Sequence, residues 1–183
     1  MISLQDAKAL IMLARDVISC VFEGKQVEVG EDLMNKFSEP QGVFVTITID
    51  KQLRGCIGFP EPVFELGEAV IKAAHAAAFE DSRFPPIEVG HVFNIEISVL
   101  TKPEEINFPK EKLTDAITVS VDGLIIRSSH NSGLLLPQVA VEQKWNSKQF
   151  LEYTCLKAQL LPNSWLDAEV KVFKFQCQIF QER

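Results

Sequence analysis

Two closely spaced segments with alternating side chains constrain the fold of this chain more than any other feature. Apolar side chains occupy every second position from Val43 to Ile49, and Leu53 and Ile57 continue the pattern with Gly55 between them. A period of two is typical of strands with one buried face, and a short link between two such strands makes an antiparallel hairpin. Further segments of this kind, with amphipathic helical segments between them, predict an α+β fold of mainly antiparallel sheets and packed helices.

The remaining elements follow from periodicity, capping residues and turn residues. Ser3 followed by Asp6 resembles the capping box that begins a helix, and Gly24 suits the position just after the end of one. The first helix is therefore expected between Ser3 and Gly24. Further helices are expected over Glu65 to Phe79, from Pro137 onward, and over about Lys148 to Ala158. Further strands are expected over Asn94 to Leu100, Ile117 to Val121, Leu124 to Ser128 and Val170 to Phe180. The dipeptide at 122–123, Asp-Gly, is expected to be a hairpin turn.

The register of the first hairpin follows from its loop length. If residues 50–52 form a three-residue loop, Ile49 pairs with Leu53 and all the apolar side chains share one face. A loop of two residues mixes the two faces. The three-residue loop therefore predicts two opposed pairs on the polar face, Thr48 with Arg54 and Thr46 with Cys56.

Cys56 is the cysteine with the most distinctive surroundings. It lies between Gly55 and Gly58, and Arg54 is on the same side of the strand at about 7 Å. A guanidinium keeps its charge and lowers the pKa of a nearby thiol, and glycines let a ligand approach closely. The functional hypothesis is a reactive or ligand-contacting thiol. The alternative is that the glycines allow tight packing and Arg54 pairs with a structural carboxylate.

Two further side chains complete the candidate chemistry. If the segment Asn94 to Leu100 joins the same sheet, Glu96 lies on its polar face and meets Arg54 across it. A structural ion pair over a solvated sheet is the alternative. Among the histidines, His130 lies in a polar loop and is the best candidate for a general base, although its proximity to Cys56 is not determined by the sequence.

Composition excludes several classes of protein. With 46% hydrophobic and 23% charged residues among 183, the chain is too apolar to be disordered. The net charge of −7 argues against nucleic-acid binding, and no segment approaches the roughly 20 apolar residues of a membrane span. Because the N-terminal segment does not have the pattern of a signal peptide, the expected compartment is the cytoplasm.

The other three cysteines lie on apolar stripes. Cys20 and Cys155 continue helical stripes, and Cys177 alternates with apolar residues in the last strand. We expect all three to be buried as small apolar side chains. The sequence has no C-x-x-C pair and no H-E-x-x-H string, so no metal site is predicted and no cofactor is assigned.

Several motifs in order resemble the AMMECR family, named after a candidate region for Alport syndrome, midface hypoplasia and elliptocytosis. These motifs are Leu53 to Gly58 with Pro60-Glu61-Pro62, Asp81 to Pro86, Ile95 to Leu100, Gly133 to Ala140, Trp145, Phe150-Leu151 and Thr154-Cys155. The resemblance covers nearly the whole chain. Ser82 stands where some relatives have proline.

The resemblance implies a single domain over residues 1–183 with two lobes around a cleft. The larger lobe would contain both termini, the smaller lobe would be inserted in the middle of the chain, and the motif at 53–58 would lie near the cleft. It implies no defined reaction. Members of the family often accompany Memo-like proteins, which resemble metal-dependent dioxygenases, and radical-SAM proteins, so both are expected as partners.

Two functional hypotheses stay open. In the first, the chain is an enzyme acting on an anionic small molecule or a protein side chain, with Cys56 as the nucleophile or redox thiol. Arg54 would lower the pKa of that thiol and hold an anionic substrate group, and Glu96 or His130 would handle protons. In the second, the same face is a non-catalytic ligand-binding or partner-docking module. The candidate ligand-binding residues are Gly55, Gly58, Thr46, Arg83, His130 and Gln138. The sequence predicts no oligomeric state.

Overall fold

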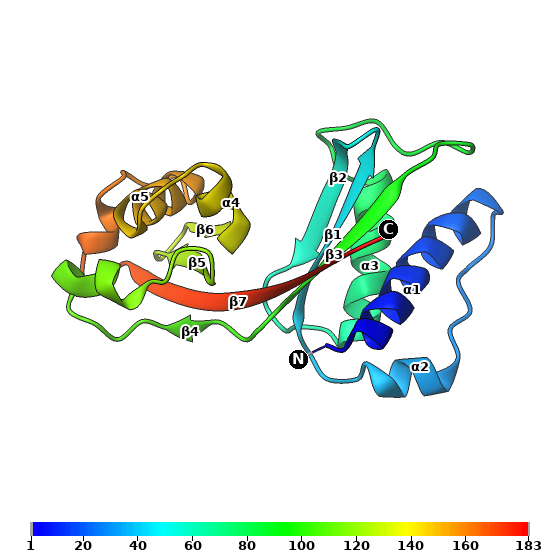
Figure 1. Ribbon diagram of the computed structural model, residues 1–183, viewed down its shortest axis with the longest axis horizontal. Coiled ribbons are helices and arrows are strands. Elements are labelled where there is room, and N and C mark those ends of the chain that lie inside the picture. The colour runs from blue at the N-terminus through cyan, green and yellow to red at the C-terminus, as the bar shows by residue number, and fades with distance from the viewer. Residues whose placement is uncertain (1, 183) are drawn as a thin grey trace. The chain divides into compact units, whose positions relative to one another are not determined.

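The computed structural model describes residues 2–182, which divide into two compact units. The first unit extends to Leu100 and takes in the chain again from Gln178, and the second unit covers Thr101–Cys177. Each unit contains antiparallel strands with helices packed against them (Figure 1). The fold is α+β, as predicted. Within the described residues, no helix is both long enough and apolar enough to cross a membrane.

The first unit is a small sheet with helices on one face. Its elements are α1 (Leu4–Phe22), α2 (Glu31–Lys36), β1 (Gly42–Ile49), β2 (Gln52–Phe59), α3 (Leu66–Phe79) and β3 (Asn94–Leu100). The strand order is β2-β1-β3, and the end of β7 (Lys171–Gln181) adds a strand beside β3. Strand β2 is therefore a free edge of this sheet.

Helix α1 begins and ends where the capping residues predict. The Ser3 side chain accepts a hydrogen bond from the backbone N–H of Asp6. Beyond the last turn Gly24 has a φ of +67°, which lets the Lys25 N–H reach the carbonyl of Cys20 at 2.8 Å. Both ends of the helix thus have hydrogen-bond partners for backbone groups that the helix itself leaves free.

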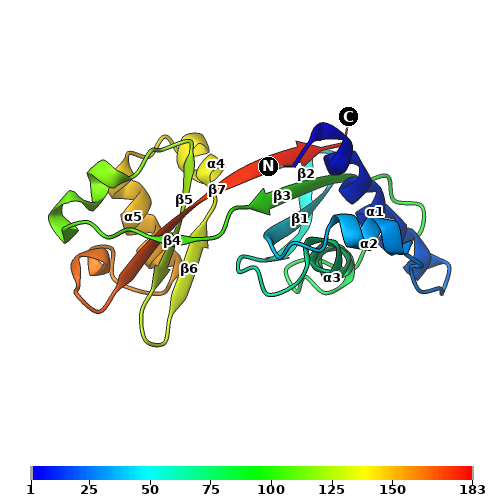
Figure 2. The same cartoon turned by 90° about the horizontal axis from the view of Figure 1, so that it is seen from below.

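The core of the first unit lies between the helices and one face of the sheet. Alternate residues of β1 and β3 are buried there: Val43, Val45, Ile47, Ile95, Ile97 and Val99. Helix α1 contributes larger side chains such as Leu10, and α3 contributes mostly alanines. Small side chains let α3 approach the sheet closely, and α1 and α3 lie side by side against it (Figure 2).

The loop of the β1–β2 hairpin differs from the prediction. Residues 50–51 form a two-residue turn with φ angles of 51° and 64°, both positive as in the tight turns that match strand twist. Consequently Ile49 pairs with Gln52 and Thr48 with Leu53. The predicted three-residue loop is wrong, and so are the partners that it assigned to Ile49 and Thr48.

A β-bulge restores the predicted faces one residue later. The register shifts so that Arg54 has no partner residue on β1, and Ile47 then pairs with Gly55 and Thr46 with Cys56. An extra residue in one strand corrects the mixing that a two-residue loop alone would cause. The prediction that Thr46 faces Cys56 is confirmed, although for a different reason.

The second unit is built in the same manner from fewer and shorter strands. Its elements are β4 (Glu104–Glu105), the 3₁₀ helix η1 (Lys110–Ala116), β5 (Asp122–Arg127), β6 (Ser132–Leu135), α4 (Pro137–Glu142), α5 (Ser147–Lys157), the 3₁₀ helix η2 (Ser164–Leu166) and most of β7. Strand β5 lies between β6 and β7, and β4 pairs with β7. A separate core forms around Phe150, Leu151 and Leu124.

The predicted hairpin at residues 117–128 is wrong. The buried Asp122 carboxylate accepts a hydrogen bond from the Thr118 N–H at 2.8 Å. The turn that this bond closes precedes β5 and does not connect two paired strands. Gly123 belongs to β5 and pairs with Phe175, and a Cβ on it would be 2.3 Å from that ring. The Asp-Gly pair therefore serves packing, and β5 pairs with β6 and β7.

Burial of the cysteines follows the prediction in part. Cys155 is fully buried in the second core, as expected. Cys20 and Cys177 are half-exposed, so the prediction is wrong for both. The buried stripe of α1 passes through Val17 and Ile18, which leaves Cys20 off its centre. Cys177 is the last residue of the second unit and lies outside its core.

Candidate functional site

The sheet of the first unit has a second face, opposite to α1 and α3. Cys56 of β2, Thr46 of β1 and Glu96 of β3 lie on it in one row across three strands. The side chain of Gln181 in β7 continues the row by donating a hydrogen bond to the Glu96 carboxylate. Cys56, Thr46 and Glu96 are all half-exposed, so this row of polar side chains is accessible within the unit.

Several neighbouring groups act on the pKa of the Cys56 thiol, and burial has the largest effect. The Thr46 hydroxyl donates a hydrogen bond to its Sγ at 3.0 Å. Burial raises the pKa of the Cys56 thiol, Thr46 and the charge of Arg83 act against that rise, and Asp81 and Glu96 add to it. The result is a pKa above that of an ordinary cysteine. The expected lowering of this pKa is therefore not found.

Two residues that follow α3 close the free edge of β2 at Cys56. Asp81 Oδ2 accepts the backbone N–H of Cys56 at 2.9 Å, and Arg83 Nη2 donates to the carbonyl of Cys56 at 3.1 Å. A neighbouring strand would satisfy the same two backbone groups. We call Asp81 and Arg83 the edge clamp.

The edge clamp is also an ion pair. The Asp81 side chain is only 4% exposed, and its Oδ2 lies 2.6 Å from Arg83 Nη2 while Oδ1 accepts from Arg83 Nε at 2.9 Å. These hydrogen bonds and the adjacent positive charge hold the pKa of Asp81 well below its usual range. The Arg83 side chain is 55% exposed. Its guanidinium is thus fixed on one side and open to solvent on the other.

Arg54 and Glu96 do not meet. Arg54 Nη2 donates to the carbonyl of Pro86 at 3.3 Å, and its Nη1 is buried without a hydrogen-bond partner among the described residues. Glu96 lies two strands away, because β1 separates β2 from β3. The predicted contact between them is wrong. The cation that acts on the thiol is Arg83, which the sequence suggested only as a ligand contact.

The space that Gly55 and Gly58 leave free is filled by the chain itself. A Cβ on Gly55 would be 1.9 Å from the carbonyl oxygen of Ala77 in α3. A Cβ on Gly58 would be 2.1 Å from the carbonyl oxygen of Val43 and would also meet the ring of Phe44. Both glycines allow tight packing within the chain. This agrees with the alternative given for them in the sequence analysis, and not with close approach by a ligand.

Two of the candidate residues belong to the other unit. His130 is exposed in the loop between β5 and β6, and Gln138 lies in the first turn of α4. The first unit itself brings together Cys56, Thr46 and Arg83, with Glu96 in the next position of the row. Across residues 2–182, no group of three or more His, Cys, Asp and Glu side chains is arranged to hold a metal ion.

Sequence reasoning did not select Asp81 as a site residue. It stands two positions after the end of an alanine-rich helix and two positions before an arginine, in a segment that contains Pro85 and Pro86. An acidic residue at the start of a rigid loop is an available signal. The sequence alone does not place that loop along the edge of β2.

The fold and the site define an α+β protein in which an Asp–Arg pair closes a sheet edge that carries a cysteine. A model of the AMMECR1 family matches residues 11–180, and the chain belongs to that family, as its motifs indicated.

Curated relatives and a solved structure agree with this assignment. A protein of Aquifex aeolicus is 43% identical over 182 residues, which cover 97% of this chain and 93% of that protein. Protein PH0010 of Pyrococcus horikoshii is 46% identical over 181 residues, 94% of this chain and 88% of that protein. A crystal structure of the uncharacterised PH0010 matches with a TM-score of 0.91 at 43% identity, covering 100% of this chain and 94% of the other, and it confirms the α+β fold.

Proposed function

We propose that the chain is a binding module that takes up the anionic group of a ligand at the sheet edge beside Cys56. One observation carries the proposal: the Arg83 guanidinium is held in place by Asp81 and the Cys56 carbonyl, yet the side chain is 55% exposed. A planar, permanently charged group that is already ordered loses little entropy when it pairs with a carboxylate or phosphate. The edge clamp thus both closes the edge and presents a positive charge.

The neighbouring side chains provide contacts of other kinds. The Cys56 thiol is a weakly polar surface, Thr46 offers a hydroxyl and Glu96 offers a carboxylate farther along the row. Such a mixture suits a ligand with an anionic group at the edge and a hydrogen-bonding group over the sheet. In this proposal Cys56 contacts the ligand and does not react with it.

A catalytic function is the second candidate, because Thr46 and Arg83 both stabilise the thiolate of Cys56. In that case Cys56 is the nucleophile, and Arg54 and Glu96 act from a greater distance than the sequence suggested. Burial acts in the opposite direction and is the largest influence on the pKa of the thiol. The two candidates therefore differ in how fast Cys56 reacts at neutral pH.

Alkylation rates distinguish the two functions. Iodoacetamide is a neutral reagent, and half-exposed Cys20 is an internal reference within the first unit. As a binding module, the chain should be alkylated more slowly at Cys56 than at Cys20 at pH 7, because only the thiolate reacts. Faster alkylation of Cys56, read by peptide mass spectrometry, would contradict the binding proposal and support the catalytic one.

A charged reagent tests the anion contact directly. Iodoacetate should be favoured over iodoacetamide at Cys56 by about threefold more than at Cys20, the size expected for one exposed charge. Arg83→Gln should remove this preference, while Arg83→Lys should keep most of it. An equal preference at both cysteines in the unaltered protein would show that Arg83 does not recruit anions to this edge.

A partner protein is a further proposed occupant of the same region. The segment after the edge clamp exposes Val89 and Val92, whose side chains are 76% and 85% exposed. Exposed apolar side chains next to a charged site are typical of protein interfaces. Memo-like and radical-SAM proteins are the partners we propose, and Val92→Asp should weaken binding of either purified protein without unfolding the chain.

A further inference from the structure

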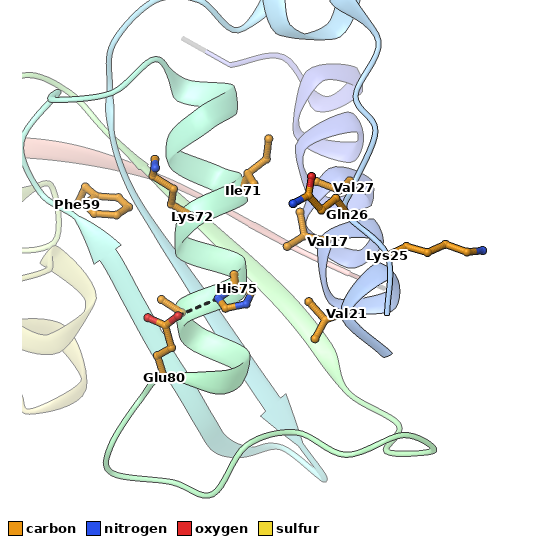
Figure 3. A pocket seen from close by; sticks show the side chains of 11 residues that line it. Val17, Val21, Lys25, Gln26, Val27, Phe59, Ile71, Lys72, His75 and Glu80 are labelled. Carbon is orange, nitrogen blue, oxygen red and sulfur yellow. Dashed lines mark ion pairs between the residues drawn. The ribbon is translucent and has the colours of Figure 1, made fainter. Parts of the chain in front are cut away.

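We propose that the first unit has a second binding site, for a small carboxylic acid with an apolar body, in a pocket between α1 and α3 (Figure 3). The pocket lies on the helical side of the sheet, whereas Cys56 lies on the opposite face. Its volume is about 650 Å³, within the range of sites for small molecules. The proposal does not depend on the function proposed for Cys56.

The floor of the pocket is apolar. Val17 and Val21 of α1 face Ile71 of α3 across it (Figure 3), and Ala76 and Phe59 also line it. Val17 is 4% exposed, so the floor reaches the core of the unit. An apolar surface of this kind gains free energy when the body of a ligand displaces water from it.

One wall of the pocket is loosely held. Residues 26–29, the cover segment, make no backbone-to-backbone hydrogen bond with any described residue. Only the side chains of Val27 and Val29 pack against the core. Glycines stand at both ends, Gly24 and Gly30, and neither has an atom within 4 Å of the place for a Cβ.

A second hollow lies on the other side of the cover segment. It has a volume of about 240 Å³ and is lined by Ala9 and Met12 of α1 together with Val29. With empty space on both sides and glycines at both ends, the segment can shift without breaking hydrogen bonds. Such a shift would widen the pocket for a ligand.

The charges at the rim favour an anion. In a chain with a net charge of −7, three basic side chains line the pocket, Lys25, Lys72 and His75, and Glu80 is the acid among the lining residues. Lys25 pairs with Glu23 at 2.8 Å, and both of these side chains are exposed. Lys72 pairs with Glu68 at 3.5 Å, and both side chains are 45% exposed. An exposed ion pair contributes little free energy. A ligand carboxylate can therefore replace Glu68 as the partner of Lys72 at a small cost in free energy. His75 Nδ1 lies 3.0 Å from Glu80 and adds a hydrogen-bonding group.

Titration with octanoate, followed by amide chemical shifts of the ¹⁵N-labelled chain, tests the site. We expect shifts at Val21, Val27, Ile71 and Ala76, and binding of octylamine at least fivefold weaker than that of octanoate. Absence of shifts at these residues at millimolar octanoate, or equal binding of octylamine, would overturn the proposal.

Variants locate the site and test its charge. Ala76→Leu fills the pocket from a half-buried position of α3 and should weaken octanoate binding at least tenfold. Gln5→Leu adds the same side chain at an exposed position of α1 that lines neither hollow, and it should leave binding unchanged. Lys72→Ala should weaken binding about two- to fivefold, as for one exposed charge pair. Unchanged binding in both Ala76→Leu and Lys72→Ala would place the ligand elsewhere.

The rate at which iodoacetamide labels Cys56 should not change when octanoate is added. This control separates the test of the pocket from the alkylation test of the anion site beside Cys56.

Discussion

Two irregular segments of the first unit are fixed to the same core in opposite ways. The edge clamp holds the backbone of Cys56 through a carboxylate and a guanidinium, with distances of 2.9 and 3.1 Å. The cover segment at 26–29 is held only by two valine side chains. Hydrogen bonds to charged groups are directional and fix a single geometry, whereas apolar contacts tolerate sliding.

The difference in attachment corresponds to a difference in what each segment can do. An anion site needs a charge at a fixed position, and Arg83 has one because Asp81 is buried beside it. A pocket for an apolar body needs a wall that can yield, and the cover segment provides one between Gly24 and Gly30. Each of the following changes alters one segment and leaves the other as its control.

Gly55→Ala should have the largest effect. Its Cβ would be 1.9 Å from the carbonyl oxygen of Ala77, so the end of α3 must move away from β2 and take the edge clamp with it. We expect a loss of about 3 kcal/mol or more in the free energy of unfolding, measured by urea denaturation. Gly30→Ala, at the end of the cover segment, has open space around it and should change stability by less than about 0.5 kcal/mol. Equal losses would remove the contrast between the two segments.

Asp81→Asn should follow in size. An amide keeps one acceptor but places an NH₂ group against Arg83, so the ion pair and some of the hydrogen bonds to Cys56 and Arg83 are lost. We expect a loss of about 2 kcal/mol in unfolding free energy. The matched control is Glu23→Gln, which removes an exposed pair with Lys25 of similar length, 2.8 Å, and should leave the midpoint of unfolding unchanged.

The contribution of Asp81 should depend on pH in one direction. Its pKa in the folded chain lies well below the ordinary value of 3.8 because of Arg83. A group with a lowered folded pKa contributes fully above the unfolded pKa, and this stability is lost as the pH falls toward the folded value. The difference in urea midpoint between the unaltered chain and Asp81→Asn should therefore be constant from pH 7 to pH 5 and shrink below pH 4. A difference that persists undiminished at pH 3 would assign the effect to packing.

Much of the first unit could be predicted because its signals are local. Alternation gave β3 its bounds, Asn94–Leu100, and the capping residues gave α1 its two ends. The loop of the first hairpin could not be predicted in the same way, because a bulge at Arg54 compensates for a two-residue turn and leaves the same faces. The alternation pattern is identical for both solutions, so it cannot choose between them.

The candidate site was predicted less completely because its main contacts come from distant residues. Thr46 and Cys56 are ten positions apart in one hairpin, and their pairing was predicted correctly. Asp81 reaches Cys56 from twenty-five positions away, through a loop whose path the sequence does not show. For the same reason Arg54, the nearer cation in sequence, was preferred over Arg83, although Arg83 is the one that acts on the thiol.

Val27→Ala should have the smallest effect on stability and the most local one. The Val27 side chain is half-buried, so losing two methyl groups should cost about 1 kcal/mol or less. Because Val27 is one of two contacts that hold the cover segment, amide hydrogen exchange of a peptide spanning 25–30 should accelerate several-fold. Exchange at the Cys56 amide, bonded to Asp81, should not change. Faster hydrogen exchange at both places would show that the cover segment and the edge clamp open together. They would then form one cooperative unit and would not be independent of each other.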